Sequence, residues 1–145
     1  MKKYHIIVAE DEKHICRTLL LILRKAGYRV TVFENGLTAL QKILDNNKTF
    51  EKFDLLITDL QMPKLSGVEL IRELEKRNTT IPILMITGYA DKKEYATIGA
   101  HMECIEKPFE PQELLDRVAY MLEEHGTLQV TEKALYKSSA LGRVP

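Results

Sequence analysis

The sequence contains few cysteines and no long apolar run. Cys16 and Cys104 are the two cysteines among 145 residues, and they do not have the paired spacing of a metal site. The four histidines are scattered, which argues against a structural zinc site. The apolar run after the amino terminus is too short to span a membrane, and no small-residue cleavage site follows it. We therefore expect a soluble, cytoplasmic protein with two buried thiols.

The sequence also lacks an excess of either charge. Lysine and arginine together number 21, aspartate and glutamate together number 21, and the formal net charge is zero. This balance argues against a nucleic-acid-binding surface spread over the whole chain, although a local basic patch is compatible with it. The length of 145 residues is typical of one domain with a sizeable core.

Segments with strand patterns alternate with helical segments along most of the chain. Apolar runs at residues 6–9, 55–58 and 83–86 are typical of strands buried on both faces. Residues 28–33 alternate in polarity, as expected for a strand nearer an edge, and a short fifth strand is expected at residues 104–105. Helical spacing of apolar residues predicts helices within 13–25, 37–44, 66–74 and 111–122. The cap spacing of Asp91 and Glu94 predicts a further helix within 91–99, which makes five.

The third and last of these helices also carry starting signals. Ser66 and Glu69 have the spacing of a capping box, in which each side chain bonds the other residue's backbone N–H. Pro111 suits the first turn of the last helix, where its missing N–H costs nothing.

Five successive βα units predict a doubly wound parallel sheet with helices on both faces, and hence an α/β fold. We expect the strand order 2-1-3-4-5, which places the topological switch point between the first and third strands. Residues 1–125 would form this domain. Residues 126–145 are too few for a second domain, so we expect a tail or the start of a linker cut from a longer protein.

Three acidic residues follow two of the predicted strands. Glu10 and Asp11 come directly after the first strand, and Asp59 comes directly after the third. Because open parallel sheets gather the carboxyl ends of these strands at one crevice, the three should meet there and raise the pKa of at least one carboxyl. They can bind Mg²⁺ (or Mn²⁺), Glu10 through a water, and the backbone carbonyl of Gln61 can add an oxygen. Alternatively, Glu10 and Asp11 simply cap the first helix, whose dipole favours acids.

Polar residues also end the fourth and fifth strands. Thr87 can donate its hydroxyl to a phosphate oxygen, and Gly88 beside it allows a backbone to approach closely. Lys107 can pair with a carboxylate or a phosphoryl group as a point charge. Taken singly, they fit an ordinary strand-end threonine and a solvated lysine. Their shared position on the acidic edge favours a divalent-metal and phosphoryl site.

Together these residues resemble the receiver domain of bacterial two-component response regulators. The resemblance covers about residues 4 to 124 and rests on motifs that occur in one order: Glu10-Asp11, Asp59 with Met62-Pro63 and Gly67, Thr87-Gly88, and Lys107-Pro108-Phe109. It implies the flavodoxin-like receiver architecture, and a phosphoacceptor that catalyses its own phosphoryl transfer and slow autodephosphorylation rather than an enzyme. The donor would be a sensor histidine kinase or a histidine phosphotransfer protein.

The resemblance also implies a role for each site residue. Asp59 would be the phosphoacceptor, and Glu10 and Asp11 would hold the metal with it. Thr87 and Lys107 would bind phosphoryl oxygens and report the modification. The Lys107–Pro108 peptide bond would be cis, as is frequent in the family.

The position three residues before the lysine departs from the family pattern. Many members carry a tyrosine or phenylalanine there, and this chain has Cys104, so switching would depend on Thr87 and the backbone. Gln61 and Tyr89 flank the site and would tune the lifetime of the phosphate. Tyr89 either shields the acyl phosphate from water or is an exposed aromatic used in packing.

The resemblance places the output on the surface from the fourth to the fifth helix. That surface would bind a downstream protein or a second copy of the chain. Alternatively, the chain is the receiver fragment of a longer transcriptional regulator or output enzyme whose effector domain is missing here. We expect no direct binding of nucleic acid or membrane by this domain.

Two other classes of function fit the sequence less well. A flavin carrier of this topology needs a phosphate-binding loop after the first strand, where Glu10-Asp11-Glu12 would repel the cofactor. A phosphatase with Asp59 as nucleophile commonly has a second acid two residues later, and here that residue is Gln61.

Overall fold

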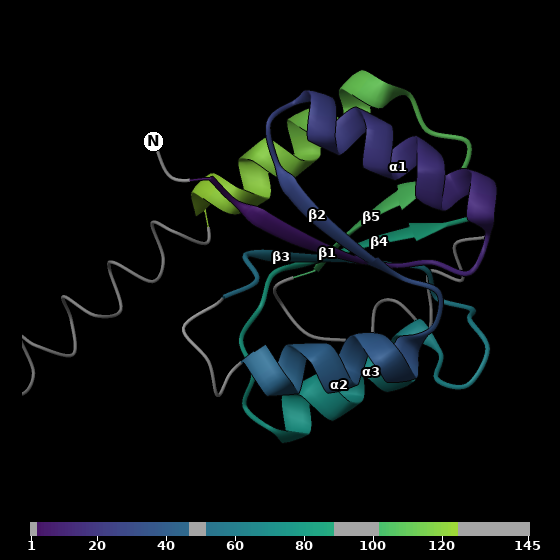
Figure 1. Ribbon diagram of the computed structural model, residues 1–145, viewed down its shortest axis with the longest axis vertical. Helices are drawn as coiled ribbons and strands as arrows, with labels where there is room; N and C mark the ends of the chain where they lie inside the picture. The colour runs from purple at the N-terminus through teal and green to yellow at the C-terminus, as the bar shows by residue number, and fades with distance from the viewer. Residues whose placement is uncertain (1–2, 47–51, 89–101, 125–145) are drawn as a thin grey trace, which may run out of the picture.

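A five-stranded parallel sheet forms the centre of the molecule (Figure 1). The computed structural model describes residues 3–46, 52–88 and 102–124. The strands are β1 (His5–Ala9), β2 (Arg29–Phe33), β3 (Leu55–Thr58), β4 (Ile83–Thr87) and β5 (Met102–Glu106). All neighbours pair in parallel, in the order β2-β1-β3-β4-β5. The predicted order is confirmed, and the switch point lies between β1 and β3.

Helices cover both faces of this sheet. The described helices are α1 (Lys13–Lys25), α2 (Gly36–Asn46), α3 (Gly67–Lys76) and a final helix over residues 111–124. Figure 1 shows α2 and α3 on one face, and α1 with the final helix on the other. The predicted fourth helix, within residues 91–99, and the predicted tail lie outside the described residues.

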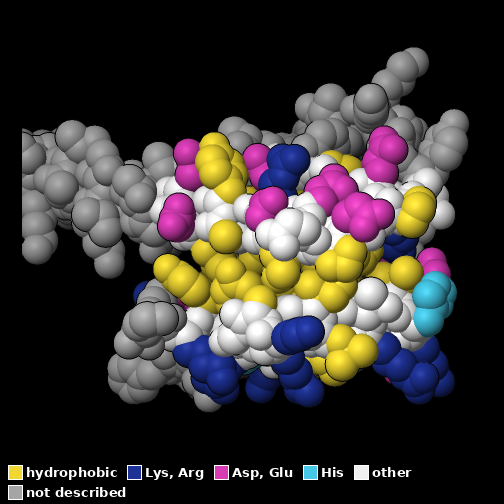
Figure 2. Space-filling view, turned by 90° about the horizontal axis from the view of Figure 1, so that it is seen from above, with side chains coloured by type: hydrophobic (Ala, Val, Ile, Leu, Met, Phe, Trp, Pro, Cys, Tyr) yellow, Lys and Arg dark blue, Asp and Glu magenta, His cyan; other side chains and the backbone are white. Residues whose placement is uncertain are grey.

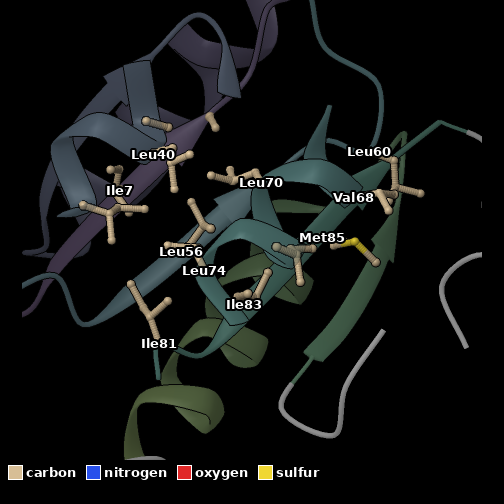
Figure 3. Close-up of a cluster of buried hydrophobic side chains, with 14 residues drawn as sticks. Ile7, Leu40, Leu56, Leu60, Val68, Leu70, Leu74, Ile81, Ile83 and Met85 are labelled. Carbon is tan, nitrogen blue, oxygen red and sulfur yellow. The ribbon is translucent and has the colours of Figure 1, made fainter. Parts of the chain in front are cut away.

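The alternation of side chains along the strands builds one apolar core on each face. On β1, Ile7 and Ala9 belong to the core beneath α2 and α3, whereas Ile6 and Val8 belong to the core beneath α1 and the final helix. Figure 3 shows the first core, where Leu40, Leu70 and Leu74 pack against Ile7, Leu56 and Met85. All five residues of β1 are buried, whereas only Val30 is buried on the edge strand β2. The helices therefore bury the central strands from both faces, whereas the edge strand β2 is more exposed.

The start of α3 lies against the residue that follows β3. The Ser66 side chain accepts from the backbone N–H of Glu69, whose carboxylate accepts from the N–H of Ser66, so the predicted capping box is confirmed. The first residue of the helix, Gly67, donates its N–H to Leu60 at 2.9 Å. A Cβ on Gly67 would come 2.0 Å from the carbonyl oxygen of Asp59. Glycine is therefore required for this close approach.

Replacing Ser66 with alanine should lower the free energy of unfolding by about 0.5–2 kcal/mol, because it leaves an N-terminal N–H of α3 without its partner. Urea denaturation followed by circular dichroism measures this change. Ser66→Thr keeps a hydroxyl cap and serves as the matched control. Equal losses in both variants would show that packing of Ser66, rather than the cap, supports the helix start.

Candidate functional site

Three carboxylates meet where β1 and β3 end. Glu10 follows β1 and donates its N–H to Phe33, and Asp59 follows β3 and donates its N–H to Ala9. Glu10, Asp11 and Asp59 each offer a carboxylate oxygen, and these oxygens lie within 4.8 Å of one another. The predicted acidic cluster is confirmed as a geometric feature of the switch point.

The three carboxylates differ in their access to solvent. The side chain of Glu10 is 2% exposed and that of Asp59 is 10% exposed, whereas Asp11 is exposed. Asp59 is therefore mostly buried but keeps some surface that can be reached from outside.

Lys107, which follows β5, joins the acidic residues. Its Nζ lies 3.0 Å from Asp59 Oδ2, 3.2 Å from both carboxylate oxygens of Glu10, and 3.6 Å from Glu12 Oε1. The side chain of Lys107 is only 12% exposed, so the alternative of a solvated surface lysine does not hold. The ammonium group ties the ends of β1, β3 and β5 to one point.

Burial and like charges decide the ionisation of Glu10. Burial of the side chain, followed by the nearby charge of Asp59, raises the pKa of Glu10 from 4.5 to about 7, although Lys107 acts in the opposite direction. At Lys107, burial alone would lower the pKa. The hydrogen bond to Asp59 and the charges of Glu10 and Asp59 outweigh it, so the pKa lies above its ordinary value. The expected rise of a carboxyl pKa is present, with burial as its main cause.

Acids after β1 do not cap α1 by the usual contacts. The N-cap residue is Glu12, and its side chain makes no capping hydrogen bond. The Glu10 carboxylate accepts from the Glu12 N–H at 3.2 Å, just before the helix, and is held by Lys107. The capping alternative therefore does not hold for Glu10, whose carboxylate is held by Lys107.

Other predicted site residues occupy less constrained places. Gln61 is exposed, and its N–H donates to Asp59 Oδ1 at 3.4 Å. Thr87 is 4% exposed, and its backbone oxygen accepts from the Lys107 N–H at 2.8 Å. A Cβ on Gly88 would meet no described atom within 4 Å, so packing against the described residues does not require glycine there. Tyr89 lies outside the described residues.

The two thiols are half-buried rather than buried, which corrects the sequence prediction. Cys16 Sγ donates to the carbonyl oxygen of Glu10 at 3.0 Å, and burial together with the acids around it raises its pKa to about 11. Cys104 packs beside the core under α2 and α3, and burial raises its pKa as well. Both groups therefore remain thiols near neutral pH. The contact between Cys16 and Glu10 was not predicted, because it depends on how α1 is placed relative to the end of β1.

Comparison with known proteins identifies the family. The family model of the response regulator receiver domain matches residues 6–119. The chain belongs to the response regulator receiver family. The Lys107–Pro108 bond of this receiver domain is cis, as the resemblance implied.

Relatives of the receiver domain include longer and similarly short proteins. It is 36% identical over 130 residues to the uncharacterized transcriptional regulatory protein YkoG of Bacillus subtilis (strain 168), covering 88% of this chain and 54% of that protein. It is 34% identical over 119 residues to the response regulator receiver protein CpdR of Brucella abortus (strain 2308), covering 81% of this chain and 95% of that protein. The chain thus spans about half of the first relative and nearly all of the second.

A solved receiver structure shares the fold. The CheY-like response regulator receiver domain protein from Methanospirillum hungatei JF-1 matches with a TM-score of 0.76 at 27% identity, covering 87% of this chain and 98% of that chain. Among the described residues, no helix has the length and apolar character needed to cross a membrane.

Replacing Glu10 with glutamine should stabilise the metal-free receiver domain at pH 8 and leave its stability nearly unchanged at pH 4. The raised pKa means that folding favours the protonated carboxyl. The contribution of the protonated Glu10 carboxyl to the free energy of unfolding is complete below about pH 4.5 and is lost as the pH rises through about 7. Because glutamine does not ionise, the variant should become more stable than the wild type as the pH rises across this range. Urea denaturation with a chelator at several pH values measures the difference.

The control for this pH series is Glu12→Gln, because Glu12 has a side chain that is 49% exposed. It should show a much smaller pH-dependent gain. A gain from Glu10→Gln that is the same at every pH would contradict the assignment.

Proposed function

We propose that this receiver domain accepts a phosphoryl group on Asp59 from a phosphohistidine of a sensor kinase or phosphotransfer protein. The observation that carries this proposal is the position of the Asp59 carboxylate. Lys107 holds one oxygen at 3.0 Å, the Gln61 N–H faces the other at 3.4 Å, and the side chain keeps 10% of its surface exposed. It is an oriented nucleophile with access from solvent.

The charge of the site suits a divalent cation. Glu10, Asp11 and Asp59 carry three formal negative charges when ionised, and Lys107 carries one positive charge, which leaves an excess of two negative charges. Oxygen ligands in this number are what Mg²⁺ or Mn²⁺ prefers, with waters completing the shell. We propose that these carboxylates hold the ion, Glu10 through a water, and that the Gln61 carbonyl contributes. When bound, the ion supplies positive charge to the phosphoryl oxygens.

The transfer itself needs little from the protein beyond position and charge. An Asp59 oxygen attacks phosphorus, a P–O bond forms, and the P–N bond to the donor histidine breaks with its electron pair going to the imidazole. The product is an acyl phosphate. Lys107 has a raised pKa and remains charged, so its ammonium group can neutralise a phosphoryl oxygen beside Asp59.

We propose that Thr87 and Lys107 report the new charge to the rest of the domain. The two residues are joined by the backbone hydrogen bond at 2.8 Å between the ends of β4 and β5. Movement of the Thr87 hydroxyl toward the phosphoryl group would displace this bond, and with it the segment leading to the final helix. Cys104 is too small to sweep the volume of an aromatic ring, so switching depends on Thr87 and the backbone.

The output partner would bind the surface from the expected fourth helix to the final helix, of which the described residues include the final helix. In a longer protein, the partner would be an effector domain, as the YkoG relative's name suggests for a transcriptional regulator. In a receiver domain that acts alone, the partner would be a separate protein. CpdR, of which the match covers 95%, has a length that fits this arrangement.

Replacing Asp59 with asparagine should abolish phosphoryl uptake, because the amide has no carboxylate oxygen to act as nucleophile. Incubation with acetyl phosphate and Mg²⁺, followed by intact-mass spectrometry, measures uptake. Asp45→Asn removes an exposed acid on α2 and is the matched control, with uptake expected at the wild-type level. Undiminished uptake by the Asp59 variant would place the acceptor elsewhere.

Replacing Thr87 with alanine should separate uptake from switching. The nucleophile and the acids remain, so the variant should still form the acyl phosphate. Without the hydroxyl, chemical shift changes at the backbone of Lys107 and in the final helix should shrink strongly in two-dimensional NMR spectra with beryllofluoride. Chemical shift changes as large as those of the wild type would mean that Lys107 transmits the change without Thr87.

A further inference from the structure

The face covered by α1 and the final helix carries opposite charges on its two halves. α1 contains four basic residues and no acidic residue, whereas residues 111–124 contain four acidic residues and one basic residue. Figure 2 looks onto this face and shows acidic side chains toward one border, basic side chains toward the other, and apolar side chains between them. The chain as a whole is neutral, so this separation is a local property of one face.

On α1, three exposed side chains form a row that we call the basic stripe: Arg17, Leu21 and Arg24. Their spacing of four and three residues places them along one side of the helix. Leu21 is 72% exposed and lies between the two arginines of the stripe. Within the described part of the chain, no ion pair involves Arg17 or Arg24.

The final helix carries a row with the same spacing and the opposite charge, which we call the acidic stripe: Asp116, Tyr120 and Glu123. All three are exposed, and Tyr120 retains 50% of its surface. Asp116 accepts one hydrogen bond from Gln112 at 2.8 Å, which leaves its second carboxylate oxygen outside that bond. Each stripe is thus charged, apolar and charged along two helical turns.

The fold places the two stripes in matching positions. Both helices start beyond the carboxyl end of a parallel strand and lie on the same face, so they run in the same direction (Figure 1). Arg17 is four residues from the start of α1 and Asp116 is five residues from the start of the final helix. With a rise of about 1.5 Å per residue, each stripe begins about 6–8 Å from the start of its own helix.

Two-fold symmetry makes such a face complementary to itself. An axis in the plane of the face and parallel to the helices places α1 of one copy over the final helix of the other. The helices then point the same way, and the contact is repeated on the other side of the axis. An axis across the helices would instead oppose α1 to α1 and bring like charges together. Charge therefore selects one of the two arrangements.

We propose that this face binds a second copy of the chain, with the basic stripe of each copy on the acidic stripe of the other. Each arginine would meet a carboxylate, and Leu21 of one copy would lie beside Tyr120 of the other. Among the described residues, three large apolar side chains are exposed, and this contact would cover two of them. This face shares the final helix with the output surface proposed above but adds α1 to it, and its use does not require phosphorylation of Asp59.

The test uses two complementary charge-reversed variants of the full chain. Arg17→Glu with Arg24→Glu makes both stripes acidic, and Asp116→Arg with Glu123→Arg makes both basic. Analytical ultracentrifugation at about 50 mM salt should show self-association of the wild type, weakened at about 500 mM because salt screens exposed charges. Each variant alone should self-associate at least about tenfold more weakly. A 1:1 mixture should form a heterodimer, since every stripe then meets its opposite.

The mixture also excludes damage to folding as the cause, because misfolded variants would not recover in it. Lys42→Glu with Arg72→Glu makes the same charge change at exposed positions on α2 and α3, on the opposite face, and should leave association unchanged. Leu21→Ser tests the apolar centre at an exposed site and should weaken association without reversing a charge. A monomeric wild type, a dimer unaffected by either reversal, or a mixture that stays monomeric would each overturn the proposal.

Discussion

The ammonium group of Lys107 is the contact on which the site depends. It lies at 3.0 Å from Asp59 and 3.2 Å from Glu10, and so joins the ends of three strands that are far apart in the sequence. One positive charge does not balance the carboxylates around it, and burial, followed by the charge of Asp59, raises the pKa of Glu10. The carboxylates that would bind a cation are thus costly to keep ionised at this edge of the sheet. Function and stability make opposite demands on this edge of the sheet.

The rest of the fold keeps these charges in place through close backbone contacts. Gly67 brings the start of α3 against the carbonyl oxygen of Asp59, and Gly36 brings α2 against the carbonyl oxygen of Leu65 in the loop between β3 and α3. Neither contact leaves room for a Cβ, so two glycines fix the loop that carries the nucleophile. The helices on that face serve mainly as a rigid support. On the other side of the site, a backbone hydrogen bond from Lys107 to Thr87 continues the pairing of β4 and β5 up to the site.

Much of this arrangement follows from the sequence because it depends on local patterns. Apolar runs and helical spacing predict the strands and most helices, Ser66 and Glu69 predict the start of α3, and strand ends predict where the acids meet. Contacts set by tertiary packing were not predicted. The Cys16 thiol is half-buried because it turns to the carbonyl oxygen of Glu10, and the proximity of Glu12 to Lys107 depends on the path of the loop after β1. The charges of the two stripes are visible in the sequence, but their shared face is known only once the strand order is known.

The final helix connects the site to the charged face. Phe109 follows Lys107 by two residues and packs against the core that also holds Leu114 of the final helix, which is fully buried. Because that core is closely packed, a displacement of Lys107 toward a phosphoryl group would act on the final helix through Phe109 rather than end in the loop. α1 also starts beside the site, since its N-cap residue Glu12 lies 3.6 Å from Lys107. A shift of either helix would change the level of one stripe against the other. Charge at Asp59 and self-association through the stripes would then be coupled by the packing of this core, with each influencing the other equally.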